Sequence, residues 1–163
     1  MMLTSVAALR SSKTDQNEPA HKSMLDSISF IVYNAGAPQG SKRHVGNGRM
    51  IESSKRVKPF RSAVEQVAID AIPVNWDLGR EFNVRVDFHF KRPKSHLTSK
   101  STLKPNAPLY PTSRAVGDLD KLQRALLDSL IGYAWYDDSQ VIGITACKRY
   151  ADQDQTIITI DYV

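Results

Sequence analysis

Apolar and polar residues alternate strictly in EFNVRVDFHFKRP, residues 81–93. This alternation is typical of a strand with one buried face. The side chains expected to face the core are Phe82, Val84, Val86, Phe88 and Phe90. His89 falls on the polar face, where we expect a solvated or hydrogen-bonded ring. Pro93 ends the strand, and a basic loop follows to about residue 113.

Three further segments predict strands. MLDSISFIVYN, from Met24, places Ile28, Phe30 and Val32 on one face. SQVIGITACKRY and TIITIDYV predict two strands near the C-terminus, and the intervening ADQDQ predicts a hairpin between them. NAGAPQGSKRHVGNGR is rich in glycine and basic residues, which indicates a loop or a short hairpin.

Two segments carry apolar residues at helical spacing. In PFRSAVEQVAIDAI, where a proline suits the first turn, these positions are Phe60, Val64, Val67, Ala68 and Ala71. A second helix is predicted by an apolar stripe at Leu119, Leu122, Leu126 and Leu130. Gly132 stands where a left-handed C-terminal cap would fall.

The order strand, helix, strand, helix, strand, strand predicts an α/β (α+β) fold with a small mixed sheet and two main helices packed on it. We expect one domain over residues 24–163, starting at Met24. Residues 1–23 are mostly polar and lack a sustained period, so they predict a disordered lead.

Several classes of protein are excluded by the composition. No apolar run approaches the roughly 20 residues that cross a bilayer, and the first residues lack the apolar stretch of a secretory signal. A single cysteine, Cys147, excludes an internal disulfide, and with four histidines it argues against structural zinc. A cytoplasmic protein without a membrane partner is expected.

The charge is unevenly distributed along a chain whose net charge is +5. Residues 41–61 hold seven Lys or Arg and one acid, and residues 91–104 hold five basic residues and no acid. Residues 117–163 hold eight acids and four bases. Either basic segment alone would be explained as a solvated loop. The two segments together favour a polyanion partner, most commonly a nucleic acid.

Two pairs of aspartates flank the second predicted helix. Asp118 and Asp120 are two residues apart. This spacing puts both carboxylates on the same face of the chain if Asp118 is extended and Asp120 lies at or near the helix N-cap. Asp137 and Asp138 come just beyond the helix, before a strand. Capping and turn roles explain both pairs structurally. If the pairs converge, their repulsion requires a cation such as Mg²⁺. The spacing leaves both interpretations open.

Arg124 lies four residues after Asp120, and Asp128 lies four residues further on. An exposed ion-pair ladder along the helix is one interpretation of this spacing. The other is a cation presented beside the carboxylates to hold a phosphate.

The segment DLDKLQRALLDSLIGYAWYDDSQVIGITACKRY resembles the signature of RusA-type Holliday junction resolvases of bacteria, phages and prophages. The resembling features are Asp-x-Asp, a helix ending in Asp-x-Leu, a Gly-containing turn, Asp-Asp-x-Gln-Val and a strand closing on Lys. GAPQGSKR and KRPKSH also look like the basic loops of phage-encoded members.

This resemblance implies a homodimeric, Mg²⁺-dependent endonuclease that acts on branched DNA, with Mn²⁺ as a substitute and no small-molecule cofactor. It places the catalytic carboxylates at Asp118, Asp120 and Asp138, with Asp137 adjacent as a further metal ligand. The expected contacts to DNA phosphates lie in the basic segments, at Lys42, Arg43, Lys55, Arg56 and Lys94, and at Lys121 on the helix.

The chain departs from the family pattern at two positions. Lys121 stands where the family commonly has Asn, and Arg124 stands where it commonly has Lys. Arg124 supplies positive charge but is a poor proton donor. The alternative function is a catalytically silent, structure-selective DNA-binding protein of the same fold. A metal-dependent nucleotide hydrolase is a third, which the two long basic segments disfavour.

Overall fold

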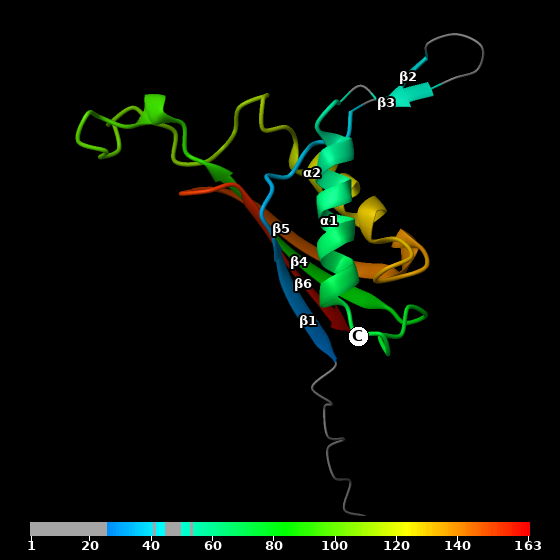
Figure 1. Cartoon of the computed structure of the whole chain (residues 1–163). Coiled ribbons are helices and arrows are strands. Elements are labelled where there is room, and N and C mark those ends of the chain that lie inside the picture. The colour runs from blue at the N-terminus through cyan, green and yellow to red at the C-terminus, as the bar shows by residue number, and fades with distance from the viewer. Residues whose placement is uncertain (1–25, 41, 45–49, 53) are drawn as a thin grey trace, which may run out of the picture.

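Two helices pack on one face of a four-stranded sheet in the computed structural model of the chain (Figure 1). The structure describes residues 26–40, 42–44, 50–52 and 54–163. The lead predicted at residues 1–23 lies outside these described residues. None of the helices in the described ranges is long and apolar enough to cross a membrane. The predicted α+β fold with a mixed sheet is confirmed.

The sheet has the strand order β1-β6-β4-β5. Its strands are β1 (Ser27–Val32), β4 (Phe82–Lys91), β5 (Val141–Ala151) and β6 (Gln155–Tyr162). Strand β6 runs antiparallel to both β1 and β4, whereas β4 and β5 are parallel. Each predicted strand is therefore present, and β5 forms one edge of the sheet.

The predicted hairpin between the last two strands is wrong, because β4 lies between β5 and β6. The connection passes over the end of β4. There the backbone N–H of Lys91 donates to Asp154 Oδ1 at 2.7 Å, and that of Arg92 donates to the Ala151 carbonyl at 3.0 Å. Strands two places apart are separated by roughly 10 Å, which three extended residues can span. A short connection therefore does not require neighbouring strands.

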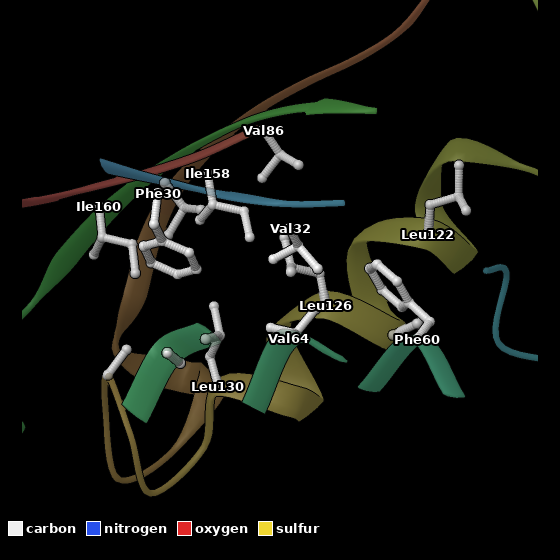
Figure 2. Close-up of a cluster of buried hydrophobic side chains, with 14 of the residues drawn as sticks. Phe30, Val32, Phe60, Val64, Val86, Leu122, Leu126, Leu130, Ile158 and Ile160 are labelled. Carbon is white, nitrogen blue, oxygen red and sulfur yellow. The ribbon is translucent and has the colours of Figure 1, made fainter. Parts of the chain in front are cut away.

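The core lies between the sheet and helices α1 (Val57–Ala71) and α2 (Leu119–Leu130). Figure 2 shows side chains from both helices meeting those of the sheet. The fully buried members include Phe60 and Val64 from α1, and Leu122, Leu126 and Leu130 from α2. Burying one such leucine contributes about 1.5–3 kcal/mol. The leucine stripe thus fixes which side of α2 faces the sheet.

Two basic segments project from the end of the molecule at which α2 begins (Figure 1). The first contains β2 (Lys42–His44) paired antiparallel with β3 (Met50–Glu52), which confirms a hairpin. The second is the long connection between β4 and α2, which contains a short 3-10 helix, η1 (Lys94–His96). The charge that the sequence concentrates in two segments is therefore carried to one end of the fold.

Candidate active site

Asp118 is the N-cap residue of α2 and has an extended backbone, with φ −79° and ψ 146°. Its side chain makes no capping hydrogen bond. Instead Asp118 Oδ2 accepts a hydrogen bond from Lys121 Nζ at 2.7 Å, while 69% of the Asp118 side chain stays exposed. The extended backbone at Asp118 is confirmed. Asp120 lies in the first turn of α2, so Asp118 takes the cap position that the sequence suggested for Asp120.

The ion pair between these side chains shifts both ionisation equilibria. The hydrogen bond and charge of Lys121 lower the pKa of Asp118 below its usual 3.8, and Lys148 adds a smaller effect in the same direction. The hydrogen bond from Asp118 raises the pKa of Lys121 above its usual 10.5. Both groups are therefore charged throughout the neutral range.

The start of α2 is fixed by contacts to three other segments. Gly117 has a φ of +92°, and a Cβ atom there would lie 2.4 Å from Pro38 Cγ, so only glycine fits. Lys148 Nζ, from β5, donates to the Gly117 carbonyl at 2.8 Å. The backbone N–H of Gln39 donates to the Lys121 carbonyl at 3.1 Å. These contacts fix the backbone that carries the Asp118 side chain.

A cavity of about 450 Å³ opens beside Asp118. It is lined by Pro38, Gln39, Gly40, Ser54, Arg114, Gly117, Asp118 and Lys121. The cations of Arg114 and Lys121 lie on its wall together with the carboxylate of Asp118. Charged donors of this kind bind phosphate oxygens well. The cavity therefore has the chemistry to receive a phosphodiester.

The second acidic pair divides into two different roles. Asp137 caps a short 3-10 helix, η2 (Asp138–Gln140): its Oδ1 accepts from the Ser139 N–H at 2.9 Å, and Gln140 Oε1 accepts from the Asp137 N–H at 3.0 Å. The hydrogen bonds from Ser139 lower the pKa of Asp137. The Asp138 side chain is exposed and has no hydrogen-bond partner among the described residues. Asp137 thus has a structural role, and Asp138 is available.

One copy of the chain keeps the two acidic pairs apart. Helix α2 has 12 residues and is about 18 Å long, with Asp118 at its start. The start of α2 also contacts Lys148, and the path along β5 from there back to Val141 is about 23 Å. Asp138 lies just before Val141. Within the described ranges, no three acidic, histidine or cysteine side chains gather to hold a metal ion.

The ion-pair ladder along α2, one of the two interpretations of this spacing, is absent at both steps. Asp128 pairs with Arg61 of α1, which joins the two helices. Arg124 is exposed and forms no ion pair with any residue that the structure describes. Its guanidinium therefore remains available for another partner.

The predicted phosphate-binding residues lie around the same end of the molecule. Lys42 and Arg43 belong to β2, whose side chains lie outside the description. Lys55 and Arg56 are exposed at the start of α1, and Arg56 donates to the Ala115 carbonyl at 2.6 Å. Lys94 is exposed in η1. Arg56 thus also joins the start of α1 to the segment that leads into α2.

Two basic residues beside the site were not predicted from the sequence. Lys148 is the lysine that closes the strand in the signature, so a signal existed, but spacing alone does not show that it reaches Gly117. Arg114 lies in an irregular connection without a pattern. Only the fold brings it to the cavity beside Asp118.

The chain matches a protein family model over most of its length. The family model described as Endodeoxyribonuclease RusA matches residues 32–161. This range runs from the last residue of β1 to Asp161 in β6 and includes both acidic pairs. No curated protein matches the chain significantly. The matched range covers well over half of the 163 residues. The chain therefore belongs to the RusA family of endodeoxyribonucleases.

Proposed function

We propose that this protein is a divalent-metal-dependent endonuclease that cleaves phosphodiester bonds in branched DNA, especially four-way (Holliday) junctions, during recombination and repair. Membership of the RusA family supports nuclease activity. The observation that carries the proposal is the exposed carboxylate of Asp118 on the wall of a cavity that also presents Arg114 and Lys121. Such a cavity brings a phosphate and a metal-ligating oxygen together.

The carboxylates suit a hard divalent cation. Asp118 and Asp120 lie two residues apart at the start of α2, and Asp138 is exposed and free of other hydrogen bonds to described residues. Mg²⁺ commonly binds through one or two carboxylates together with water and phosphate oxygens, and Mn²⁺ accepts similar ligands. Bound there, the cation would neutralise charge on the phosphate and lower the pKa of a water molecule.

The chain's own cations would bind and orient the DNA. Arg114 and Lys121 would hold the phosphate at the cavity, and Arg124 offers a further positive charge on α2. Lys42, Arg43, Lys55, Arg56 and Lys94 would contact phosphates away from the cleavage point. An arginine is a poor proton donor, so the role of Arg124 would be to hold charge rather than to deliver a proton.

Asp137 contributes less directly to this site. One of its oxygens already accepts from the Ser139 N–H, so Asp137 would position η2 and with it Asp138. We further propose that the enzyme works as a homodimer in the cytoplasm of a bacterial cell. The resemblance to phage-encoded members suggests a phage or prophage source.

The proposal is tested with a synthetic four-way junction and a linear duplex made from the same strands. We expect junction cleavage in Mg²⁺ or Mn²⁺, none in EDTA, and much weaker cleavage of the duplex. Asp118→Asn and Asp120→Asn should abolish cleavage while junction binding persists. Tight junction binding without cleavage at any metal concentration would instead support the catalytically silent DNA-binding protein.

A further inference from the structure

We propose that a second cavity, beside the one at Asp118, binds a nucleotide at the branch point of the DNA: Tyr33 stacks on its base, and Lys55 and Arg56 bind its phosphate. This site rests on the proposed function, because it is what would distinguish branched DNA from linear duplex. The cavity has a volume of about 440 Å³. We call it the Tyr33 cavity, and its lining includes Tyr33, Asn34, Ala37, Lys55, Arg56 and Asp154.

Tyr33 presents an aromatic ring that the fold itself does not use. It directly follows the last residue of β1 and is 73% exposed. Among the described residues, none hydrogen-bonds to its hydroxyl or stacks on its ring. Its backbone is fixed nonetheless: the Asn34 N–H donates to the Val32 carbonyl at 2.8 Å, and Thr156 Oγ1 donates to the Asn34 carbonyl at 3.0 Å. A fixed, exposed aromatic ring is a stacking platform for a base of any identity, because every base has a π-face.

Lys55 and Arg56 bring positive charge to the same cavity from the start of α1. Both side chains are exposed. Arg56 donates from Nη2 to the Ala115 carbonyl at 2.6 Å, which holds the guanidinium in place and leaves it further donors for a phosphate. The first turn of α1 contains no acidic residue, and no side chain caps it. The positive end of the helix dipole therefore adds to the two cations.

Asp154 determines which way round a nucleotide fits. It lines the cavity from the connection between β5 and β6, and its Oδ1 accepts from the Lys91 N–H at 2.7 Å. A carboxylate repels a phosphate, so the phosphate belongs at the cations of Lys55 and Arg56. The base then lies on the side of the cavity that the sheet provides, against the ring of Tyr33.

The Tyr33 cavity adjoins the cavity at Asp118. Ala37 and Lys55 line the first, and their chain neighbours Pro38 and Ser54 line the second. Consecutive Cα atoms lie only about 3.8 Å apart, so the two cavities share a wall along both segments. A strand that presents a phosphate to Asp118 therefore reaches Tyr33 within a few nucleotides of the cleavage point.

The arrangement selects for DNA structure. In a continuous duplex, both faces of each base are covered by its neighbours, and extruding a base costs free energy. At a branch point the stack is interrupted, so a base there exposes a face at lower cost. A stacking platform beside the cleavage site consequently favours branched DNA over linear duplex, whereas the cations alone would bind both through their phosphates.

The test measures affinity in EDTA, where no cleavage occurs, for a four-way junction and a linear duplex made from the same strands. Tyr33→Ala should weaken junction binding about 5- to 100-fold, the usual effect of losing one base–aromatic stack, and leave duplex binding unchanged. Tyr33→Leu fills a similar volume without a π-face and should behave like Tyr33→Ala. Tyr33→Phe keeps the ring and should bind the junction as the wild type does. The matched control is Ile31→Ala, at an isoleucine 40% exposed on β1, which should bind both DNAs normally.

Abasic junctions locate the base. Each nucleotide around the branch point is replaced in turn by an abasic site. At one position the replacement should weaken wild-type binding but cost Tyr33→Ala nothing further, because its partner in the stack is already missing. Equal losses in the two proteins at every position would overturn base recognition by Tyr33.

The remaining outcomes separate this site from the proposed function. If the wild type cleaves the junction in Mg²⁺ but Tyr33→Ala binds it normally, or loses junction and duplex affinity equally, the nuclease stands and the Tyr33 site is overturned. If the wild type neither prefers nor cleaves the junction, the proposed function fails, and the Tyr33 site fails with it.

Discussion

Lys121 holds the carboxylate of Asp118 at 2.7 Å from its own side-chain nitrogen, one turn into the helix that Asp118 begins. A divalent cation that binds Asp118 must therefore compete with a positive charge already in place. The resemblance to RusA-type resolvases makes this position informative, because the family commonly has Asn where this chain has Lys121. Two measurable consequences concern Lys121 and Asp118.

The first prediction concerns the ionisation of Asp118. Replacing Lys121 by Asn removes the hydrogen bond and charge that lower the pKa of Asp118, so that pKa should rise toward its usual 3.8. A group with a depressed folded-state pKa stabilises the fold above its unfolded pKa, and this stabilisation is lost as the pH falls through the folded pKa. Lys121→Asn should therefore flatten the loss of stability below about pH 4. Carboxyl NMR titration measures the pKa, with Lys58→Asn on α1 as the control; an unchanged Asp118 titration would contradict the ion pair.

The second prediction concerns the cation. Lys121→Asn removes a competitor for the Asp118 oxygens, so half-maximal junction cleavage should require less Mg²⁺ than in the wild type. Junction binding in EDTA should weaken, since a positive charge on the cavity wall is lost. A titration of cleavage rate against Mg²⁺ tests the first effect, and a binding isotherm tests the second. A higher Mg²⁺ requirement in the variant would mean that Lys121 assists the cation instead.

The third prediction separates the two adjacent aspartates. Asp138→Asn should reduce cleavage by orders of magnitude and leave junction affinity unchanged or tighter, because a carboxylate that repels phosphate is gone. Its melting temperature should hold. Asp137→Ala should instead lower the melting temperature, since it removes the acceptor for the Ser139 N–H. Cleavage, affinity and melting temperature are measured on the same preparations; wild-type cleavage by Asp138→Asn would remove this residue from the site.

The fourth prediction concerns the basic segments. Each phosphate contact removed by neutralising Lys42, Arg43, Lys55, Arg56 or Lys94 should reduce the log–log slope of affinity against salt by roughly 0.9. Arg85→Gln is the control, because Arg85 pairs with Asp161 on the sheet face opposite the helices. Junction affinity is measured over a range of salt concentrations. A slope that stays constant in the multiple variant would show that these segments point away from DNA.

The fifth prediction uses two glycines with positive φ as a matched pair. Gly117→Ala and Gly132→Ala both force a side chain into left-handed backbone, at a cost of about 1–2 kcal/mol each. Only Gly117→Ala also drives a Cβ against Pro38, whereas nothing lies within 4 Å at Gly132. Denaturant unfolding should therefore show the larger loss for Gly117→Ala. Equal losses would mean that the contact with Pro38 relaxes freely.

Local patterns in the sequence predicted the helices and strands of this fold well, because each helix or strand depends mainly on residues close together in the sequence. The alternation at Phe82–Phe90 and the leucine stripe of α2 each report which face is buried, and both faces are buried as expected. Which strands pair with each other in the sheet could not be predicted in this way. Nothing in TIITIDYV states that β6 pairs with β1 and β4 instead of β5, since its alternation suits any partner.

The candidate site was predictable only in part, for the same reason. Asp118 and Asp138 could be identified by their motif, but the distance between them follows from α2 and β5 together. Arg114 is brought to the cavity by an irregular connection that carries no periodic signal. The role of Asp137 in capping η2 depends on Gln140, which also bonds the carbonyls of Leu78 and Arg80.

The position of β6 constrains how the protein is made. Residues 155–162 form a strand that pairs with β1 at residues 27–32 on one side and with β4 on the other. During synthesis, β1 has no partner in the sheet until residues 155–162 have left the ribosome, because β6 is its neighbour. Pairings of such long sequence separation also form slowly. A chain from which β6 has not yet emerged therefore has an incomplete sheet, with β1 unpaired and one edge of β4 uncovered.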